Sequence, residues 1–238
     1  GEVFRYPSQM RSIFVQMFIQ LADIVVVTTE ALRQLYTPWA KDIRVIPNCV
    51  STEMRRDVPK AINEKIKILW SGSNSHLPDL KLIIDPLKNI YKKYQDKVEF
   101  HFQGGLPFEE LFSDMTIRTH PMVSFGDYLN LIQEINPDIS IAPLDRNIFN
   151  LSKSNLKYLQ MTLMEAAFVG SAYGPYLTID NGVDGFTCKS NHDWEKHLSN
   201  LIENEDVRIN CIKNATKYIN NCFMIEKLLP KWKEMLMY

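Results

Sequence analysis

The sequence predicts an α/β protein built on a doubly wound parallel sheet. Short apolar runs alternate with amphipathic stretches between residues 65 and about 190, and this alternation is typical of βαβ units. Strands and helices that alternate at this spacing argue for a parallel sheet that helices cover on both faces. The turns after these runs are rich in small and polar residues, and an open parallel sheet binds its ligands at such turns.

Composition narrows the class of protein. The 238 residues suffice for one large domain, or for one domain with an appendage. Hydrophobic residues make up 45% and charged residues 23%, and the formal net charge of -1 gives no global basic field to recruit nucleic acid. No apolar run approaches the roughly 20 residues of a membrane-spanning helix, and residues 1–20 lack the apolar core of a secretion signal. We therefore expect a cytoplasmic protein without a nucleic-acid partner.

The cysteines and the known catalytic motifs point to no metal site and to no catalytic residue. Cys49, Cys188, Cys211 and Cys222 are scattered without CxxC or Cys/His ligand spacing, so we expect reduced, partly buried thiols. No HExxH, GxSxG or P-loop pattern occurs in the chain.

Residues 1–47 are predicted to be the end of a preceding domain. Their pattern gives a helix at 11–21, a β-branched strand at 23–28, a helix capped by Thr29, and a strand at 43–46. Two strands are too few for a sheet domain of their own. Residues 48–64 are polar and lack periodicity, so they are interpreted as a linker.

Residues 65–190 supply the main domain, and residues 191–238 are predicted to be helical. The expected strands lie at 66–70, 98–102 and 138–142, with a weaker one at 167–172. Helices are expected from Pro78 to about Tyr94, at 127–134, and from Ser152 or Lys153 onward, with a turn at 180–185.

Three turns that follow predicted strands are candidate ligand-binding segments. At Gly72 the small residues let the backbone approach a ligand, and the next helix presents free amides to an anion. After residue 142 a loop enters a helix start whose dipole, together with Lys153, favours a phosphate. At Gly174 the backbone can approach closely, and a neighbouring tyrosine can stack on a base or sugar. Each turn also has a purely structural interpretation: a tight turn with a helix cap, a solvated helix start, or a Gly-Pro turn whose tyrosines pack on helices.

Taken in order, five segments resemble glycosyltransferase family 4-like enzymes of the GT-B class, in a subgroup that acts in bacterial surface-polysaccharide assembly. Residues 22–29 (ADIVVVTT) and 43–50 (IRVIPNCV) resemble the last elements of the family's N-terminal domain and its "VIPNGV" segment. Residues 70–79 resemble the subgroup's Y-x-G-S-x-x-H-x-x-D turn. Residues 138–158 give the closest match, and residues 171–185 complete a similarity that covers essentially the whole chain.

The resemblance implies a Rossmann-like, GT-B C-terminal domain that binds a nucleoside-diphosphate sugar. The sugar would pass, with retention, to a glycan or lipid-linked acceptor held by an N-terminal domain, of which only the end is present. No metal and no cofactor besides the donor are implied, because helix N-termini, backbone amides and basic side chains meet the diphosphate charge. The implied donor-binding residues are Gly72, Ser73, Asn74, His76, Asn150, Lys153, Ser154, Lys157, Gln160, Gly174, Pro175 and Tyr176.

Two departures from the family pattern leave alternatives open. The ribose-binding glutamate of the family falls on Gln160, whose amide accepts a hydroxyl hydrogen bond without charge assistance, and Glu165 lies too far along to replace it. Most of the N-terminal half is missing, so the chain is interpreted as a fragment that binds donor without turning it over. The alternatives are a degenerate, non-catalytic module for docking or assembly, and a different Rossmann-like nucleotide binder such as a nucleotide-sugar epimerase. The lack of GxGxxG argues against a dinucleotide cofactor.

The final helices carry an apolar set that can cover the sheet, cross back to the other half, or make a peripheral contact with the inner face of a membrane. The first two roles are favoured over the third. The set comprises Phe223, Met224, Leu228, Leu229 and Trp232.

Overall fold

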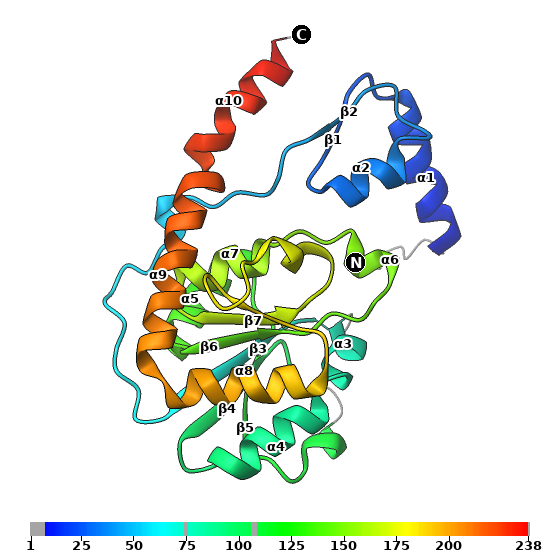
Figure 1. Ribbon diagram of the computed structural model, residues 1–238. Coiled ribbons are helices and arrows are strands. Elements are labelled where there is room, and N and C mark those ends of the chain that lie inside the picture. The colour runs from blue at the N-terminus through cyan, green and yellow to red at the C-terminus, as the bar shows by residue number, and fades with distance from the viewer. Residues whose placement is uncertain (1–7, 74–75, 106–108, 238) are drawn as a thin grey trace.

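The computed structural model describes residues 8–73, 76–105 and 109–237. Figure 1 shows a sheet flanked by helices, with a smaller N-terminal part lying over it and two successive C-terminal helices, α9 (Glu205–Cys222) and α10 (Ile225–Leu236), rising beside both. The predicted fold class is confirmed, because the main sheet is parallel and helices pack on both of its faces.

The main sheet has six strands, all paired in parallel, in the order β5-β4-β3-β6-β7-β8. The strand order therefore reverses between β3 and β6, as in doubly wound nucleotide-binding folds. The strands are β3 (Ile66–Ser71), β4 (Val98–Gln103), β5 (Ile117–His120), β6 (Ile139–Ala142), β7 (Ala167–Ser171) and β8 (Phe186–Cys188).

Helices cover this sheet in two layers. One layer consists of α3 (Leu77–Lys81), α4 (Ile84–Tyr94) and α8 (Asn191–Glu203). The other consists of α5 (Phe125–Ile135), α7 (Leu156–Leu163) and α9 (Glu205–Cys222). Each layer packs against one face of the sheet and forms a separate hydrophobic core there. The sheet, with β3 among its central strands, lies between the two cores.

The central strand β3 contributes apolar side chains to both cores. Ile68 and Trp70 point into the core beneath α4 and α8, whereas Leu69 points into the core beneath α7 and α9. All three side chains are at most 2% exposed. Burying one such side chain stabilises the fold by about 1.5–3 kcal/mol, so a strand covered on both faces carries few polar residues.

Three sequence predictions were incomplete or wrong. The edge strands β5 and β8 were not predicted. The helix expected from Pro78 is interrupted, so that α3 ends at Lys81 and α4 begins at Ile84. The helix expected to start at Ser152 or Lys153 starts later, at Leu156. A separate short helix α6 (Ile148–Leu151) precedes it, and Lys153 lies in the link between the two helices.

The N-terminal part consists of α1 (Ser8–Leu21), β1 (Val25–Val27), α2 (Glu30–Tyr36) and β2 (Ile43–Val45). The two strands pair in parallel. The predicted cap of α2 is confirmed, because Thr29 Oγ1 accepts a hydrogen bond from Leu32 N at 3.2 Å. Much of α1 faces outward, and Phe18 and Leu21 are 71% and 72% exposed.

The linker is tied to the C-terminal helices. Val50 exchanges backbone hydrogen bonds with the junction between α9 and α10 (Ile225–Leu236). The short turn η1 (Thr52–Met54) follows, and an extended run then leads to β3. Of the five apolar residues considered for membrane contact, Phe223, Met224 and Leu228 are buried, and Leu229 and Trp232 are partly exposed. In the upper part of Figure 1, α10 runs toward β2, and residues 44–46 share a cavity wall with Lys231 of this helix. No helix in the described ranges is long and apolar enough to cross a membrane.

Candidate functional site

The reversal of strand order between β3 and β6 creates the position where a doubly wound sheet binds ligands, just beyond the carboxyl ends of the strands. Three segments meet there. They are the turn after β3, the loop between β6 and α7, and the short helix η4 (Gly174–Thr178) after β7. These segments contain the candidate turns singled out in the sequence.

A buried carboxylate, Asp79 in α3, connects two of these segments. Its side chain is 3% exposed, and its Oδ1 accepts hydrogen bonds from Asp145 N at 2.8 Å and from Asn150 Nδ2 at 2.6 Å. His76 Nδ1 lies 3.0 Å from Oδ2, and Lys153 Nζ lies 3.8 Å from the same oxygen. Burial alone would raise the pKa of Asp79, but the hydrogen bonds from His76, Asp145 and Asn150 outweigh burial and lower it. Asp79 is therefore charged at neutral pH and fixes the surrounding donors.

Two lysines give the site a positive balance. Lys153 Nζ lies 3.3 Å from His76 Nδ1 and 4.6 Å from the centre of the Phe149 ring. Lys157 Nζ donates a hydrogen bond to the backbone oxygen of Ser71, at the end of β3. Burial lowers the pKa of both lysines, and the pKa of Lys157, which also feels the charge of Lys153, falls to about 8. Two ammonium groups beside a single carboxylate favour the binding of an anion.

Polar side chains from β3, β4 and α5 border the site around Lys153 and Lys157, which is called the lysine site below. Ser71 Oγ donates to Gln103 Oε1 at 2.9 Å and lies 2.8 Å from Tyr128 Oη. Gln103 Nε2 in turn donates to Pro121 O at 3.1 Å. Sequence reasoning missed these contacts, because Ser71 and Gln103 lie one residue beyond the strands predicted at 66–70 and 98–102 and the contacting residues lie far apart in the chain.

The predicted turn at residues 72–76 lies at this site, although Asn74 is outside the described residues. Gly72 and Ser73 follow β3 directly, and His76 N donates to Ser73 O at 2.9 Å. A Cβ on Gly72 would lie 2.7 Å from Cζ2 of Trp70. The packing of Trp70 therefore explains this glycine without a ligand.

The predicted residues of the β6–α7 loop also gather here. The Asn150 side chain is buried, and its Oδ1 has no hydrogen-bond partner among the described residues. Ser154 lies beside Lys153 and accepts a hydrogen bond from Asn48 at 2.7 Å. Gln160 lies within α7, one turn after Lys157, and is 6% exposed.

The stacking role expected of the tyrosine in the third turn is wrong for Tyr176. Its ring is 4% exposed, and its centre lies 4.9 Å from the ring centre of Phe168 in the core. Pro175 is buried as well. Gly174 has a φ of 57°, and a Cβ there would lie 2.9 Å from the backbone oxygen of Asn150. Gly174 therefore allows η4 to approach α6. The third turn packs against α6 and so helps to hold this helix in place at the site.

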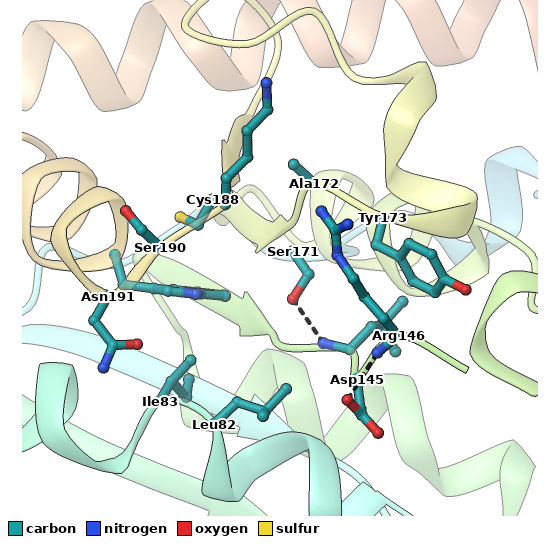
Figure 2. Close-up of a pocket in the computed structure, with 13 residues that line it drawn as sticks. Leu82, Ile83, Asp145, Arg146, Ser171, Ala172, Tyr173, Cys188, Ser190 and Asn191 are labelled. Carbon is teal, nitrogen blue, oxygen red and sulfur yellow. Dashed lines mark hydrogen bonds between the residues drawn. The ribbon is translucent and has the colours of Figure 1, made fainter.

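A cavity of about 290 Å³ adjoins the site beyond Asp145 (Figure 2). Asp145 and Arg146 line one side, and the segment around Ser190 at the start of α8 lines another. Ser171 Oγ accepts a hydrogen bond from Leu144 N at 2.8 Å and so closes the inner wall. Because Asp145 N also bonds Asp79, the cavity and the lysine site share one wall.

The cysteines and other metal-binding side chains are dispersed. All four cysteines are free, Cys188 and Cys211 are buried, and Cys222 is exposed. Within the described ranges, no group of three or more His, Cys, Asp or Glu side chains is arranged to hold a metal ion.

Comparison with known proteins gives structural likeness without sequence likeness. No family model and no curated protein matches the chain. Among solved structures, TarM from S. aureus, in a complex with fondaparinux, α-GlcNAc-glycerol and UDP, aligns with 97% of this chain at 16% identity and a TM-score of 0.72. HepE from Anabaena, in a complex with UDP and glucose, aligns with 97% of this chain at 16% identity and a TM-score of 0.75. WaaG, a glycosyltransferase of lipopolysaccharide biosynthesis, aligns with 93% at 13% identity and a TM-score of 0.70.

The shares of the other chains are smaller. This chain covers 48% of TarM, 67% of HepE and 66% of WaaG. It thus spans about half the length of TarM. From its N-terminal strands to its last helices, the chain has the fold of the GT-B glycosyltransferases.

Proposed function

We propose that this chain binds a nucleoside-diphosphate sugar at the β3–β6 site and belongs to a glycosyltransferase that moves the sugar to a glycan or other surface-polysaccharide acceptor. The observation that carries the proposal is the pair Lys153 and Lys157 at the reversal of strand order. Solved proteins of the same fold hold UDP, UDP with glucose, or UDP-glucose. A diphosphate is the part of such a donor that two ammonium groups recognise.

The chemistry follows from electrostatics. Glycosyl transfer leaves negative charge on the departing diphosphate, and preorganised cations lower the barrier by stabilising that charge. Lys153 and Lys157 are preorganised because Asp79 and the Ser71 backbone oxygen hold their ammonium groups. Bound diphosphate would raise the pKa of Lys157 again, since an opposite charge favours the protonated form. In this proposal the lysines and nearby amides meet the diphosphate charge without a metal or a further cofactor.

The acceptor belongs to the other half of the protein in this proposal. A GT-B N-terminal domain needs a complete sheet, and this chain supplies β1 and β2. The acceptor, glycan or lipid-linked, would bind to that domain, and transfer would proceed with retention. We place the protein in the cytoplasm, and α10 is the element that would make a peripheral contact at the inner face of the membrane.

Calorimetric titration tests donor binding directly. The chain is titrated with UDP, GDP and their sugars, and Lys153→Ala is compared with Lys213→Ala, an exposed lysine on α9. We expect Lys153→Ala to weaken nucleotide binding about tenfold or more, because a charge-assisted hydrogen bond contributes roughly 1.5–3 kcal/mol. Lys213→Ala should leave affinity unchanged. A folded chain that binds no nucleotide at millimolar concentration, alone or within the full-length protein, would contradict the proposal.

A second candidate function is a non-catalytic module for docking or assembly, and Gln160 favours it. The neutral amide lies buried where the resemblance expects a ribose-binding carboxylate. The two functions are separated by assaying donor hydrolysis and transfer with the full-length protein and its Gln160→Glu variant. Turnover by the unaltered protein supports the enzyme. Turnover gained only by Gln160→Glu supports a module derived from an enzyme.

A further inference from the structure

The loop that carries Lys153 is held from the N-terminal part by two hydrogen bonds. Thr29 Oγ1 donates to the backbone oxygen of Ser152 at 3.2 Å. Asn48 Nδ2 donates to Ser154 Oγ at 2.7 Å. The two bonds therefore fall on the residues immediately before and after Lys153.

The loop links α6 to α7, and its own backbone hydrogen bonds run back to α6. Ser152 N donates to Ile148 O at 3.1 Å, and Lys153 N donates to Asn150 O at 3.3 Å. Ser152 folds back onto α6, with its Oγ donating to Ile148 O at 2.8 Å. Because Lys153 lies between two helices and outside both, contacts from elsewhere decide where its ammonium group lies.

The two donors on the N-terminal side are well fixed. Thr29 follows β1 and caps α2, while Asn48 follows β2. The strands pair in parallel with Val27 opposite Val45, so the residues that follow them emerge at the same edge of the small sheet. The carboxyl ends of the small sheet thus touch the anion-binding loop of the large one, and Figure 1 shows the N-terminal part over α6 and α7.

We propose that Thr29 and Asn48 are positioning residues, which fix the loop around Lys153 and thereby set the affinity for the diphosphate of the donor. This inference rests on the proposed function. Neither residue needs to touch the nucleotide. Their effect passes through Ser152 and Ser154 to the Lys153 ammonium group beside His76.

A double-mutant cycle on UDP affinity tests the route. Asn48→Ala should weaken UDP binding about fivefold, the equivalent of one hydrogen bond of roughly 1 kcal/mol. Ser154→Ala weakens binding as well, by the same bond and by any contact that Ser154 makes to UDP. In the Ser154→Ala background, Asn48→Ala should have almost no further effect, because the partner atom is gone.

Matched variants separate positioning from general stability. Thr29→Ser keeps the hydroxyl and should keep wild-type affinity, whereas Thr29→Val should lose affinity. Thr37→Val removes a hydroxyl that donates to Arg33 O within the same N-terminal part, and UDP affinity should not change. Uridine, which lacks phosphate, should bind all variants equally. Amide hydrogen exchange at residues 152–154 should become faster in Asn48→Ala and stay unchanged in Thr37→Val.

The outcomes distinguish this inference from the proposed function. Wild-type binding of UDP with unchanged affinity in Asn48→Ala overturns the inference and leaves the proposed function standing. Full additivity of Asn48→Ala and Ser154→Ala also overturns it, because the effect would then not pass through their bond. A wild-type chain that binds no UDP overturns both.

Discussion

The two sheets of this molecule differ in how completely they are covered. In the six-stranded sheet, Ile68, Phe100 and Phe168 are at most 1% exposed between two helical layers. In the two-stranded part, few side chains are buried, and Phe18 and Leu21 of α1 remain largely exposed. A pair of strands cannot make an independent core, so the second part takes its order from its neighbours. The contrast indicates that the six-stranded sheet supplies most of the folding stability, whereas the two-stranded sheet positions the residues that contact it.

The largest expected effect contrasts the two regions directly. Phe100→Ala should lower the free energy of unfolding by about 3–5 kcal/mol, because it removes a ring from a close-packed core. Phe18→Ala should change it by less than about 0.5 kcal/mol, since that ring is 71% exposed. Chemical denaturation of both variants measures the difference. Equal losses would break the comparison by showing that α1 is covered in solution.

A smaller effect is expected at a backbone contact inside the well-covered region. Gly104 has a φ of 100°, and a Cβ there would lie 1.9 Å from the backbone oxygen of Gly72. Gly104→Ala should therefore cost about 2 kcal/mol or more, from strain and from displacement of the turn after β3. Gly182 also has a positive φ, 87°, but no atom lies within 4 Å of its added Cβ. Gly182→Ala should cost about 1 kcal/mol, and a cost equal to that of Gly104→Ala would show that backbone strain alone decides.

The pH dependence of UDP binding sharpens the role of the boundary between the regions. Burial lowers the pKa of Lys157 to about 8, so the free site loses this charge as pH rises through that value. UDP affinity should fall about tenfold between pH 7 and pH 9, as the protonated fraction falls. Uridine binding should not change over this range.

Deprotonation of Lys157 does not unfold the chain, so unfolding at this residue cannot explain the expected fall in UDP affinity. The pKa of Lys157 is lower in the folded chain than in the unfolded one. At pH values between these two pKa values, the unfolded chain therefore binds more protons. The contribution of this group to folding stability therefore increases from about pH 8 to about pH 10.4, the range in which UDP affinity is weakened. Denaturation at each pH provides the control. Affinity that stays constant across pH 8 would contradict a role for the Lys157 charge.

Only a small change in stability is expected from removing the whole N-terminal part. A chain of residues 48–238 keeps Val50 and its pairing with the α9–α10 junction. Its unfolding free energy should differ from that of the whole chain by less than about 1 kcal/mol, since both hydrophobic cores remain almost intact. Coincident denaturation curves support the comparison, and a large loss would show that the small sheet is part of the main cooperative unit.

Sequence patterns predicted the parts of this fold that obey local rules. β3 was recognised because it is apolar on both faces along Ile68, Leu69 and Trp70, and β4 and β6 because apolar residues recur at every second position. The edge strands β5 and β8 were missed, because Ile117 is the one apolar residue of β5 and β8 is only three residues long. Short or edge strands are buried on fewer sides, so their composition differs little from that of loops.

The turns of the candidate site were predicted from the sequence, but the hydrogen bonds between its residues were not. Lys153 was assigned to a helix start because serine and asparagine around it resemble capping residues, and the real start lies after them at Leu156. Asp79 lies in the first turn of α3, and its buried carboxylate also bonds Asp145 and Asn150, which the sequence does not indicate. A near-neighbour signal existed in His76, three residues before Asp79, but no local pattern reveals partners that lie more than 60 residues away.

The strand order has a consequence for how the chain reaches this fold. β4 follows β3 after the two helices α3 and α4, and their pairing closes a comparatively short loop. β6, the other neighbour of β3, arrives only after β4, β5 and α5 have been passed, and it pairs Ile68 with Ile139. Closing the longer loop costs more chain entropy before any contact repays it, so the β3–β4 unit is expected to form first and the β3–β6 pairing to limit the folding rate. The proposed nucleotide site lies at that late pairing, so under this proposal nucleotide can bind only once the slow step of folding is complete.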